Sequence, residues 1–267
     1  MKRFDYTNKT AIITGASSGI GREIAKRLTL DYGCTVYAIA RQEEKLKRLK
    51  EEIGNNLISY PMDVSFSENW EKLREHFEAL GKKADILINC AGFLPPFAGL
   101  ENTEIGVVRE AMEVNFFSSV YSAYTMLPVI SEGGIIVNVS SASALCPFAG
   151  ISAYSASKAA LQRFTECISC EVKKVSILSV MPGFVKTDIM KNQTLNEKDR
   201  GLIKLFSADL DKTVNKMLKR IRKRKKRIVI GTDAHLMSIM YRFFPSLTPV
   251  LISKIIKKSK LELFDKV

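Results

Sequence analysis

The sequence predicts an α/β protein built on a doubly wound parallel sheet, with helices on both faces giving three layers. Strand-like apolar runs alternate with amphipathic helical runs, and such alternation implies parallel strands joined by right-handed crossovers. The 267 residues, 46% of them hydrophobic, can bury an ordinary core. No repeat, low-complexity tract or linker divides the chain. We therefore expect a single domain over residues 1–267, with about seven strands.

Short strand-like runs and longer helical runs account for most of the chain. The strand-like runs are bounded by turn residues, whereas the helical runs repeat apolar residues every three or four positions. The expected strands are 9–15, 35–40, 57–64, 84–92, 133–141, 174–183 and 226–231. The expected helices are 19–33, 43–54, 67–81, 107–130 and 154–172.

Three glycines stand in TGASSGIG (14–21), between the first strand and the first helix. In a doubly wound sheet this turn lies in the crevice where ligands bind. Gly15 can adopt a turn geometry that side chains disfavour, and Gly19 and Gly21 allow the backbone to approach a pyrophosphate. The N-terminus of the following helix offers free N–H groups to that anion. A plain structural turn is the alternative, but the position after the first strand favours a nucleotide.

Ser17, Ser18 and Arg41 are polar residues expected to contact that nucleotide. The two serines add hydroxyl donors to the loop. A dinucleotide fold carries an acid at the end of the second strand for NAD, or a basic residue for the 2′-phosphate of NADP. Here the strand runs directly into Arg41, with no acid at 39–41. Arginine binds phosphate strongly, so NADP(H) is favoured over NAD(H), unless Arg41 is only an exposed loop residue.

YSASK places Tyr154 and Lys158 four residues apart, on one face of a helix. A nearby ammonium group, with a cationic nicotinamide beside it, favours the phenolate and lowers the pKa of the tyrosine. Tyr154 could then exchange a proton with a substrate hydroxyl or carbonyl. Ser141, thirteen residues earlier at a strand end, offers a hydroxyl for the substrate oxygen. Taken alone, the pair would be an ordinary helix pair.

Together these motifs resemble the classical short-chain dehydrogenase/reductase family over nearly the whole chain. They stand in the family's order: TGASSGIG at 14–21, DV at 63–64, NCAG at 89–92, VN at 114–115, serine at 141, YSASK at 154–158 and PGFVKT at 182–187. The resemblance implies a Rossmann fold and an oxidoreductase. It implies Tyr154 as general acid/base and Ser141 as the group that orients the substrate oxygen. Lys158 would lower the pKa of the tyrosine and bind the nicotinamide ribose, and Asn115 would hold a proton-relay water.

The resemblance also extends the cofactor-binding set. It places Asp63 and Val64 beside the adenine, 89–92 beneath the cofactor, and 182–187 over the nicotinamide. The full expected set is Gly15, Ser17, Ser18, Gly19, Ile20, Gly21, Arg41, Asp63, Val64, Asn89, Ala91, Gly92, Tyr154, Lys158, Pro182, Gly183, Val185 and Thr187. Cys90 departs from the family, which more often has a second Asn there. Ser18 also departs, because many NADP-dependent members carry a basic residue, which leaves Arg41 as the main determinant.

Apolar residues after the strand ends and in an expected lid at about 187–206 favour a bulky apolar substrate. The pocket candidates are Phe93, Leu94, Leu145, Phe148, Phe184, Met190 and Phe206. We expect interconversion of a secondary alcohol and a ketone on a hydroxysteroid or bile acid. A 3-oxoacyl or sphingoid lipid ketone is the alternative substrate. A catalytically silent NADP-binding sensor is an alternative of another class.

The C-terminal extension at about 235–267 is apolar, interrupted by Pro245 and Pro249, and flanked by basic residues. Three interpretations stay open: a packing helix of the core or a dimer, a wall of the substrate pocket, and a segment on an anionic membrane. The net charge of +13 arises largely from 216–227, KMLKRIRKRKKR. That run is typical of a solvated helix face and its exit, and contact with an anionic membrane surface or an acidic substrate is the alternative. With few aromatics among the charges, nucleic-acid binding is not expected.

The cysteine and histidine content bears on location and metal binding. The five cysteines form no disulfide framework and indicate reduced thiols in a cytoplasmic protein. With two histidines in the chain, a metal centre is not expected. The charged N-terminus does not predict a secretory signal. By resemblance, the protein is expected to form a homodimer or homotetramer.

Overall fold

A computed structural model of the chain describes residues 3–193, 196, 201, 207–258, 264 and 267. The strands are β1 (Thr10–Thr14), β2 (Thr35–Ala40), β3 (Leu57–Pro61), β4 (Ala84–Asn89), β5 (Ile130–Val139), β6 (Ser176–Pro182) and β7 (Arg227–Ile230). The helices are α1 (Gly19–Tyr32), α2 (Glu43–Ile53), α3 (Ser67–Ala79), α4 (Ile105–Met112), α5 (Ser118–Met126), α6 (Ser152–Glu171), α8 (Leu210–Ile221), α9 (Thr232–Phe243) and α10 (Leu247–Lys258). These elements confirm the α/β class.

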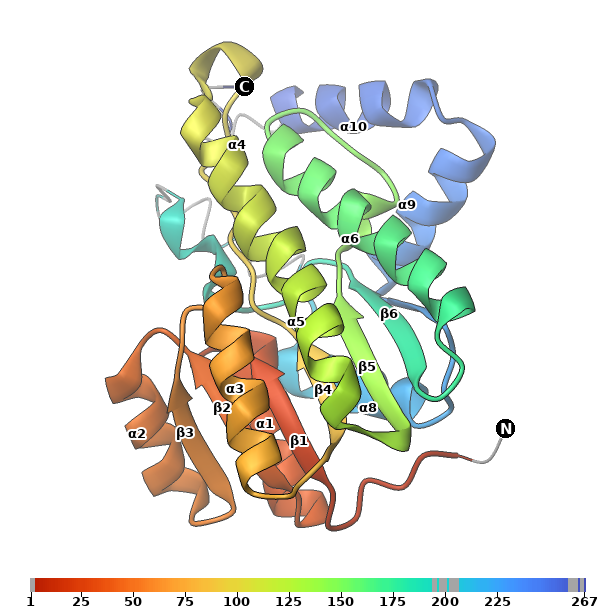
Figure 1. The fold of residues 1–267 in the computed structure, drawn as a ribbon. Helices are drawn as coiled ribbons and strands as arrows, with labels where there is room; N and C mark the ends of the chain where they lie inside the picture. The colour runs from red at the N-terminus through yellow and green to blue at the C-terminus, as the bar shows by residue number, and fades with distance from the viewer. Residues whose placement is uncertain (1–2, 194–195, 197–200, 202–206, 259–263, 265–266) are drawn as a thin grey trace.

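The described strands form one seven-stranded sheet in the order β3-β2-β1-β4-β5-β6-β7, and every neighbouring pair is parallel. The order reverses direction at β1, so the crevice between β1 and β4 opens at the carboxyl ends of the strands. In Figure 1, α3, α5 and α6 cover the front of the sheet, with α1 and α8 behind it. The expected three-layer architecture is therefore correct.

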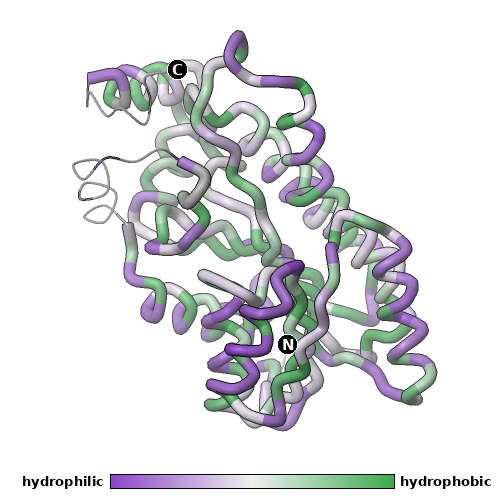
Figure 2. Tube along the Cα trace, turned by 90° about the vertical axis from the view of Figure 1, so that its left-hand side faces the viewer, coloured by the Kyte–Doolittle hydropathy of each residue, from purple (hydrophilic) through white to green (hydrophobic). Residues whose placement is uncertain are grey.

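Alternate residues along each strand are buried on opposite faces of the sheet. In β1, Ile13 packs with the α1 and α8 side, whereas Ile12 packs with the α3 and α5 side. This two-sided burial explains why the strands are continuous apolar runs. In Figure 2 the helices mix green and purple along their length, as expected for helices with one buried face.

The region predicted as one helix over 107–130 differs in detail. It consists of α4, a π-helical turn at Glu113–Phe117, α5 and a short 3-10 turn at Leu127–Val129, after which β5 begins at Ile130. Pro128 cannot continue an α-helix, and this explains the tighter turn and the early strand. The π turn contains Asn115, one of the predicted functional residues.

Candidate active site

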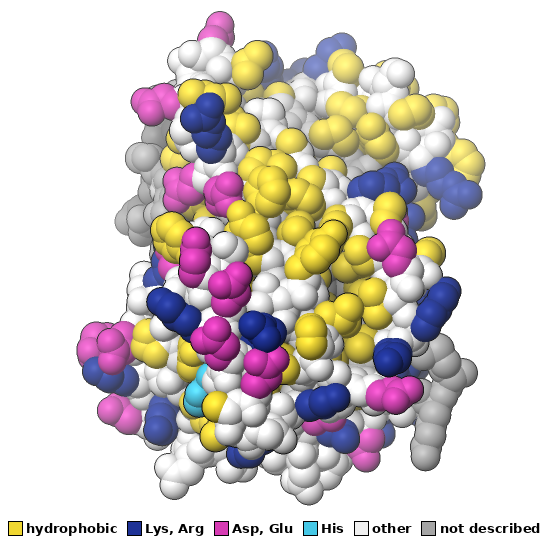
Figure 3. Space-filling view, viewed as in Figure 1, with side chains coloured by type: hydrophobic (Ala, Val, Ile, Leu, Met, Phe, Trp, Pro, Cys, Tyr) yellow, Lys and Arg dark blue, Asp and Glu magenta, His cyan; other side chains and the backbone are white. Residues whose placement is uncertain are grey.

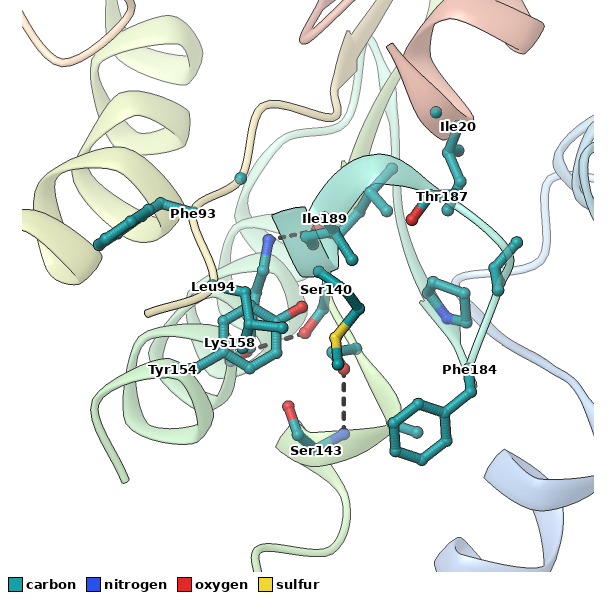
Figure 4. Close-up of a pocket in the computed structure, with 18 of the residues that line it drawn as sticks. Ile20, Phe93, Leu94, Ser140, Ser143, Tyr154, Lys158, Phe184, Thr187 and Ile189 are labelled. Atoms are coloured by element: carbon teal, nitrogen blue, oxygen red, sulfur yellow. Dashed lines mark hydrogen bonds between the residues drawn. The ribbon is translucent and has the colours of Figure 1, made fainter. Parts of the chain in front are cut away.

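A cavity of about 420 Å³ opens at the carboxyl ends of the strands, where the sheet order reverses. Its walls come from the β1–α1 turn, the segments after β4 and β5, the start of α6, the loop after β6, and α9. Its volume lies within the usual range for small-molecule sites. Figure 4 shows Tyr154 and Lys158 entering from α6, with Ile20 and Thr187 at the end nearer α1.

The glycines of the β1–α1 turn are required by close backbone contacts. Gly15 has φ +67°, and a Cβ there would lie 3.0 Å from the backbone nitrogen of Ala91. A Cβ on Gly21 would lie 2.5 Å from the carbonyl oxygen of Gly15. Thr14 Oγ1 accepts hydrogen bonds from the N–H groups of Cys90 and Ala91, at 2.9 and 3.0 Å, which fixes the turn against β4.

The N-terminus of α1 faces the cavity. Ser18 is the N-cap residue, and its side chain makes no capping hydrogen bond. Ser18, Gly19, Ile20 and Gly21 all line the cavity. The first N–H groups of an α-helix have no partner within the helix, so this end can receive an anion such as a pyrophosphate. The residues present therefore fit the dinucleotide that the loop predicts.

Arg41, directly after β2, also lines the cavity and keeps its side chain 64% exposed. Its Nη1 lies 4.0 Å from Oδ2 of Asp63, which is a weak contact at the surface. Asp63 itself accepts hydrogen bonds from the N–H and hydroxyl of Ser65. The guanidinium group is therefore accessible to an added phosphate.

Tyr154, Ser141 and Lys158 converge at the other end of the cavity. The Ser141 side chain interacts with the Tyr154 phenol and lowers its pKa in part. Ser141 follows β5, and its Oγ accepts the N–H of Ser143 at 3.1 Å. Lys158 lies one helical turn after Tyr154; its Nζ donates to the carbonyl of Val139 at 3.0 Å and lies 5.9 Å from the centre of the tyrosine ring. Residues from separate sequence motifs thus lie close together in the structure.

Burial changes the pKa of both titratable groups in opposite directions. Desolvation raises the pKa of Tyr154 to about 12, although the Ser141 side chain lowers it in part. Desolvation lowers the pKa of Lys158 to about 8. The expectation that the Lys158 ammonium and a cationic nicotinamide together lower the pKa of the tyrosine concerns the cofactor-bound site and stays a prediction. At neutral pH the phenol carries its proton and can donate it.

Asn115 lies at the back of the site rather than on the cavity wall. Its Oδ1 accepts the N–H of Phe93 at 2.7 Å, and its Nδ2 donates to the carbonyl of Phe93 and to Ser157 Oγ. The side chain thereby fixes the segment after β4, which carries Phe93 into the cavity. The proton-relay role of Asn115 stays a prediction.

Most of the predicted site residues line the cavity, but not all of them do. Those that line it are Gly15, Ser18, Gly19, Ile20, Gly21, Arg41, Gly92, Ser141, Tyr154, Lys158, Pro182, Gly183, Val185 and Thr187. Those absent from its described lining are Ser17, Asp63, Val64, Asn89, Ala91 and Asn115. Asn89 instead donates to Oδ1 of Asn138 at 2.8 Å and joins β4 to β5. The Cys90 thiol lines the cavity, and burial raises its pKa to about 12, so it stays neutral.

Most of the predicted apolar wall is present. Phe93, Leu94, Phe148, Phe184 and Met190 line the cavity. Leu145 is buried but does not line it, and Phe206 lies outside the described residues. The sequence reasoning missed Phe97, Glu110, Ser143, Ile151, Ser207 and Met237.

The predicted lid is described only in part. Residues 187–190 line the cavity, whereas 194–206 lie outside the described residues apart from 196 and 201. Gln193 anchors the described part, because it accepts the N–H of Phe97 at 2.9 Å and donates to the carbonyl of Pro95 at 2.7 Å. At its base, Asp233 of α9 accepts the N–H of Phe184 at 2.7 Å. The lid segment is thus joined to both the post-β4 segment and α9.

Solved structures share this fold. A short chain dehydrogenase from Burkholderia cenocepacia J2315, in complex with NADP, has a TM-score of 0.79 at 24% identity, covering 93% of this chain and 99% of that chain. A short chain dehydrogenase/reductase from Burkholderia phymatum, in complex with NAD, has a TM-score of 0.80 at 21% identity, covering 91% and 96%. At these identities the likeness shows the fold alone.

The relatives found by sequence have a higher identity to this chain. A fatty acyl-CoA reductase of Acinetobacter baylyi is 33% identical over 259 residues, covering 94% of this chain and 85% of that protein. An 11-beta-hydroxysteroid dehydrogenase-like 2 of Arabidopsis thaliana is 35% identical over 195 residues, covering 71% of this chain and 63% of that protein. The family model described as short chain dehydrogenase matches residues 9–198. The chain therefore belongs to the short-chain dehydrogenase/reductase family of NAD(P)-binding oxidoreductases.

Proposed function

We propose that the protein is an NADP(H)-dependent oxidoreductase that interconverts a secondary alcohol and a ketone on a bulky apolar substrate. One observation carries the proposal. Tyr154, Ser141 and Lys158 line one cavity together with the wall formed by Phe93, Leu94 and other apolar side chains.

Each polar group has a distinct proposed role. The nicotinamide supplies the hydride when the cofactor is bound. In reduction, Tyr154 donates its proton to the carbonyl oxygen that Ser141 positions. Lys158 binds the cofactor ribose and contributes positive charge that stabilises the developing phenolate. Asn115 holds the 93–97 segment and takes part in reprotonation.

Arg41 supports NADP(H) as the preferred cofactor. Its accessible guanidinium lies at the end of β2, where the 2′-phosphate of NADP is expected to bind in a dinucleotide fold. Structural neighbours have been solved with NADP and with NAD, so the preference for NADP(H) rests on Arg41. The pyrophosphate is assigned to the N-terminus of α1.

A hydroxysteroid or bile acid is the proposed substrate class. The aromatic and aliphatic wall suits a rigid apolar body, and one relative carries a hydroxysteroid dehydrogenase-like name. A long-chain 3-oxoacyl or sphingoid lipid ketone is the second candidate. It is favoured by the similarity to a fatty acyl-CoA reductase over 94% of the chain.

The test is nicotinamide absorbance decay with NADPH and NADH in parallel. The panel contains ketosteroids, oxo-bile acids, 3-oxoacyl esters and small ketones. Tyr154→Phe should lose at least about a hundredfold in turnover while keeping NADPH affinity and melting temperature. Tyr124→Phe is the matched control, since that phenol is exposed and does not line the cavity.

Three results would contradict the proposal. Turnover by Tyr154→Phe equal to wild type would remove the assigned acid. Preference for small hydrophilic ketones would overturn the substrate class. NADPH binding without turnover of any panel member would favour the sensor.

A homodimer or homotetramer in the cytoplasm completes the proposal. Figure 3 shows hydrophobic side chains gathered over the helices at the centre of this face. The half-buried Phe116 and Phe164 rings in that helical layer are in edge contact at 6.0 Å. Light scattering on the purified chain measures the oligomeric state.

A further inference from the structure

The α9–α10 pair, Thr232–Phe243 and Leu247–Lys258, presents an apolar face that the described chain leaves uncovered. The side chains of this face are 38% to 68% exposed. They are Leu236, Ile239, Phe243, Phe244, Leu247, Val250, Leu251 and Ile255. We call this set the α9–α10 face. It belongs to no motif of the oxidoreductase site.

The exposed residues follow helical spacing in both helices. In α9 they recur at 236, 239 and 243, and in α10 at 247, 250, 251 and 255. Such spacing places each set on one side of its helix. Phe244 and Pro245 connect the two helices, and Phe244 is 60% exposed. Each helix therefore presents a row of exposed apolar side chains rather than scattered single residues.

Basic side chains accompany this face. Residues 232–258 contain four basic residues, Arg242, Lys254, Lys257 and Lys258, against one acid, Asp233. The carboxylate of Asp233 accepts the N–H of Phe184, away from the face. Lys254 falls on the same helical side as Leu247, Val250 and Leu251. Figure 3 shows hydrophobic and basic side chains intermixed at the upper right, over α9 and α10.

This combination points to one occupant. We propose that the α9–α10 face binds the surface of an anionic phospholipid bilayer, with the apolar side chains inserted among the acyl chains and the lysines at the headgroups. The core of an interface with a second copy is depleted of charged residues, so Lys254 within the apolar row argues against that occupant. Long lysine side chains can instead extend to the headgroup layer.

The helix lengths define how the pair would bind. Each helix has 12 residues, which corresponds to about 18 Å against the ~30 Å of a hydrocarbon core. None of the described helices is long and apolar enough to cross a membrane. The pair would therefore lie along the surface.

The helices that carry this face also contact the cavity region. Met237 of α9 lines the cavity, and the N–H of Ala149, next to the lining residue Phe148, donates to Ser253 Oγ of α10 at 3.2 Å. A bilayer under α9 and α10 would bring a membrane-dissolved molecule close to the site. The binding itself does not depend on the proposed reaction.

The test is co-sedimentation of the full chain with vesicles. One set contains phosphatidylglycerol mixed with phosphatidylcholine, and the other contains phosphatidylcholine alone. We expect binding to the anionic set that weakens with added salt. Lys254→Gln/Lys257→Gln/Lys258→Gln should weaken it about a hundredfold, at about fivefold per cation. Phe243→Ser/Phe244→Ser should weaken it at least about tenfold.

Matched controls carry the same changes elsewhere. Phe66→Ser/Leu80→Ser removes two exposed apolar residues outside α9 and α10, and Lys45→Gln/Lys50→Gln/Lys72→Gln removes three exposed lysines of α2 and α3. Both should bind vesicles like wild type. Melting temperature and NADPH affinity report on folding.

Two results overturn the proposal. The first is a wild-type chain that binds neither vesicle set. The second is a Phe243→Ser/Phe244→Ser variant that keeps vesicle binding but falls to a smaller oligomer, which would make this face an interface between copies.

Discussion

The buried environment of Lys158 determines the pKa of its ammonium group. Its side chain is 3% exposed, yet its ammonium has a carbonyl partner in Val139 at 3.0 Å. A single neutral acceptor only partly offsets the desolvation of a charge, and this is why its pKa falls to about 8. A cofactor ribose would add acceptors there.

The low pKa of Lys158 predicts a pH dependence of ketone reduction. The ammonium is present below about 8 and is lost as the pH rises through that value, while Tyr154, with a pKa of about 12, keeps its proton. The value of kcat/KM for NADPH, which reports the free enzyme, should therefore fall above about pH 8. Lys158→Arg keeps its charge and should remove that fall, even at a lower rate. A wild-type profile that stays level through that range would contradict the assignment.

Arg41 is the residue assigned to cofactor choice. Arg41→Gln should weaken NADPH binding about tenfold to a hundredfold, because a charge-assisted phosphate contact is lost. NADH binding should change little. Fluorescence titration with both nucleotides measures this, and Arg48→Gln, an exposed arginine of α2, is the control. Equal losses of affinity for NADPH and NADH would show that Arg41 does not bind the 2′-phosphate.

At the level of elements, α1 depends on how closely it begins beside β1. Gly21→Ala would place a methyl group 2.5 Å from the carbonyl oxygen of Gly15. The helix must move away, so we expect weaker binding of NADPH and NADH alike. The free energy of unfolding should fall by roughly 1–3 kcal/mol.

Gly106→Ala provides the comparison for that substitution. A methyl group on this glycine of α4 would meet no atom within 4 Å, so alanine should leave stability unchanged or raise it by up to about 1 kcal/mol. Urea denaturation and nucleotide titration measure both variants. Equal behaviour of the two would show that the start of α1 tolerates a side chain.

The basic run 216–227 shows what sequence alone cannot assign. It predicts a solvated helix face and its exit, and the run contains the end of α8, a turn and the start of β7. Several of its cations donate to main-chain carbonyls: Arg222 to Phe4, Arg224 to Gly133 and Lys226 to Ser169. These partners are distant in the chain, so no local charge pattern identifies them.

For the whole molecule, Arg224 joins distant parts of the fold. Its guanidinium donates to Ser176 Oγ at 2.6 Å and to the carbonyl of Gly133 at 2.7 Å, and lies 5.1 Å from the ring centre of Phe4. Arg224→Gln should lower the free energy of unfolding by about 2 kcal/mol. Lys225→Gln, the exposed neighbour, should be close to neutral. Urea denaturation compares them, and equal stabilities would rule out this bridging role.

The fold and the reactive end of the site could be predicted because their signals are local. The apolar runs identify the strands, and Tyr154 with Lys158 share one helix turn. Phe97 and Met237 could not be found that way, because they reach the cavity only through tertiary packing. Desolvation of Tyr154, which raises its pKa, likewise depends on tertiary packing and could not be found from the local motif.

The position of Met237 has a consequence for how such a protein diversifies. The family match ends at residue 198, whereas Ser207 and Met237 contribute to the same cavity from later in the chain. Substitutions within residues 207–258 can therefore alter the cavity while the residues assigned to proton and hydride transfer stay unchanged. Grafting 207–258 from a relative onto this chain should transfer substrate preference without rebuilding the catalytic centre.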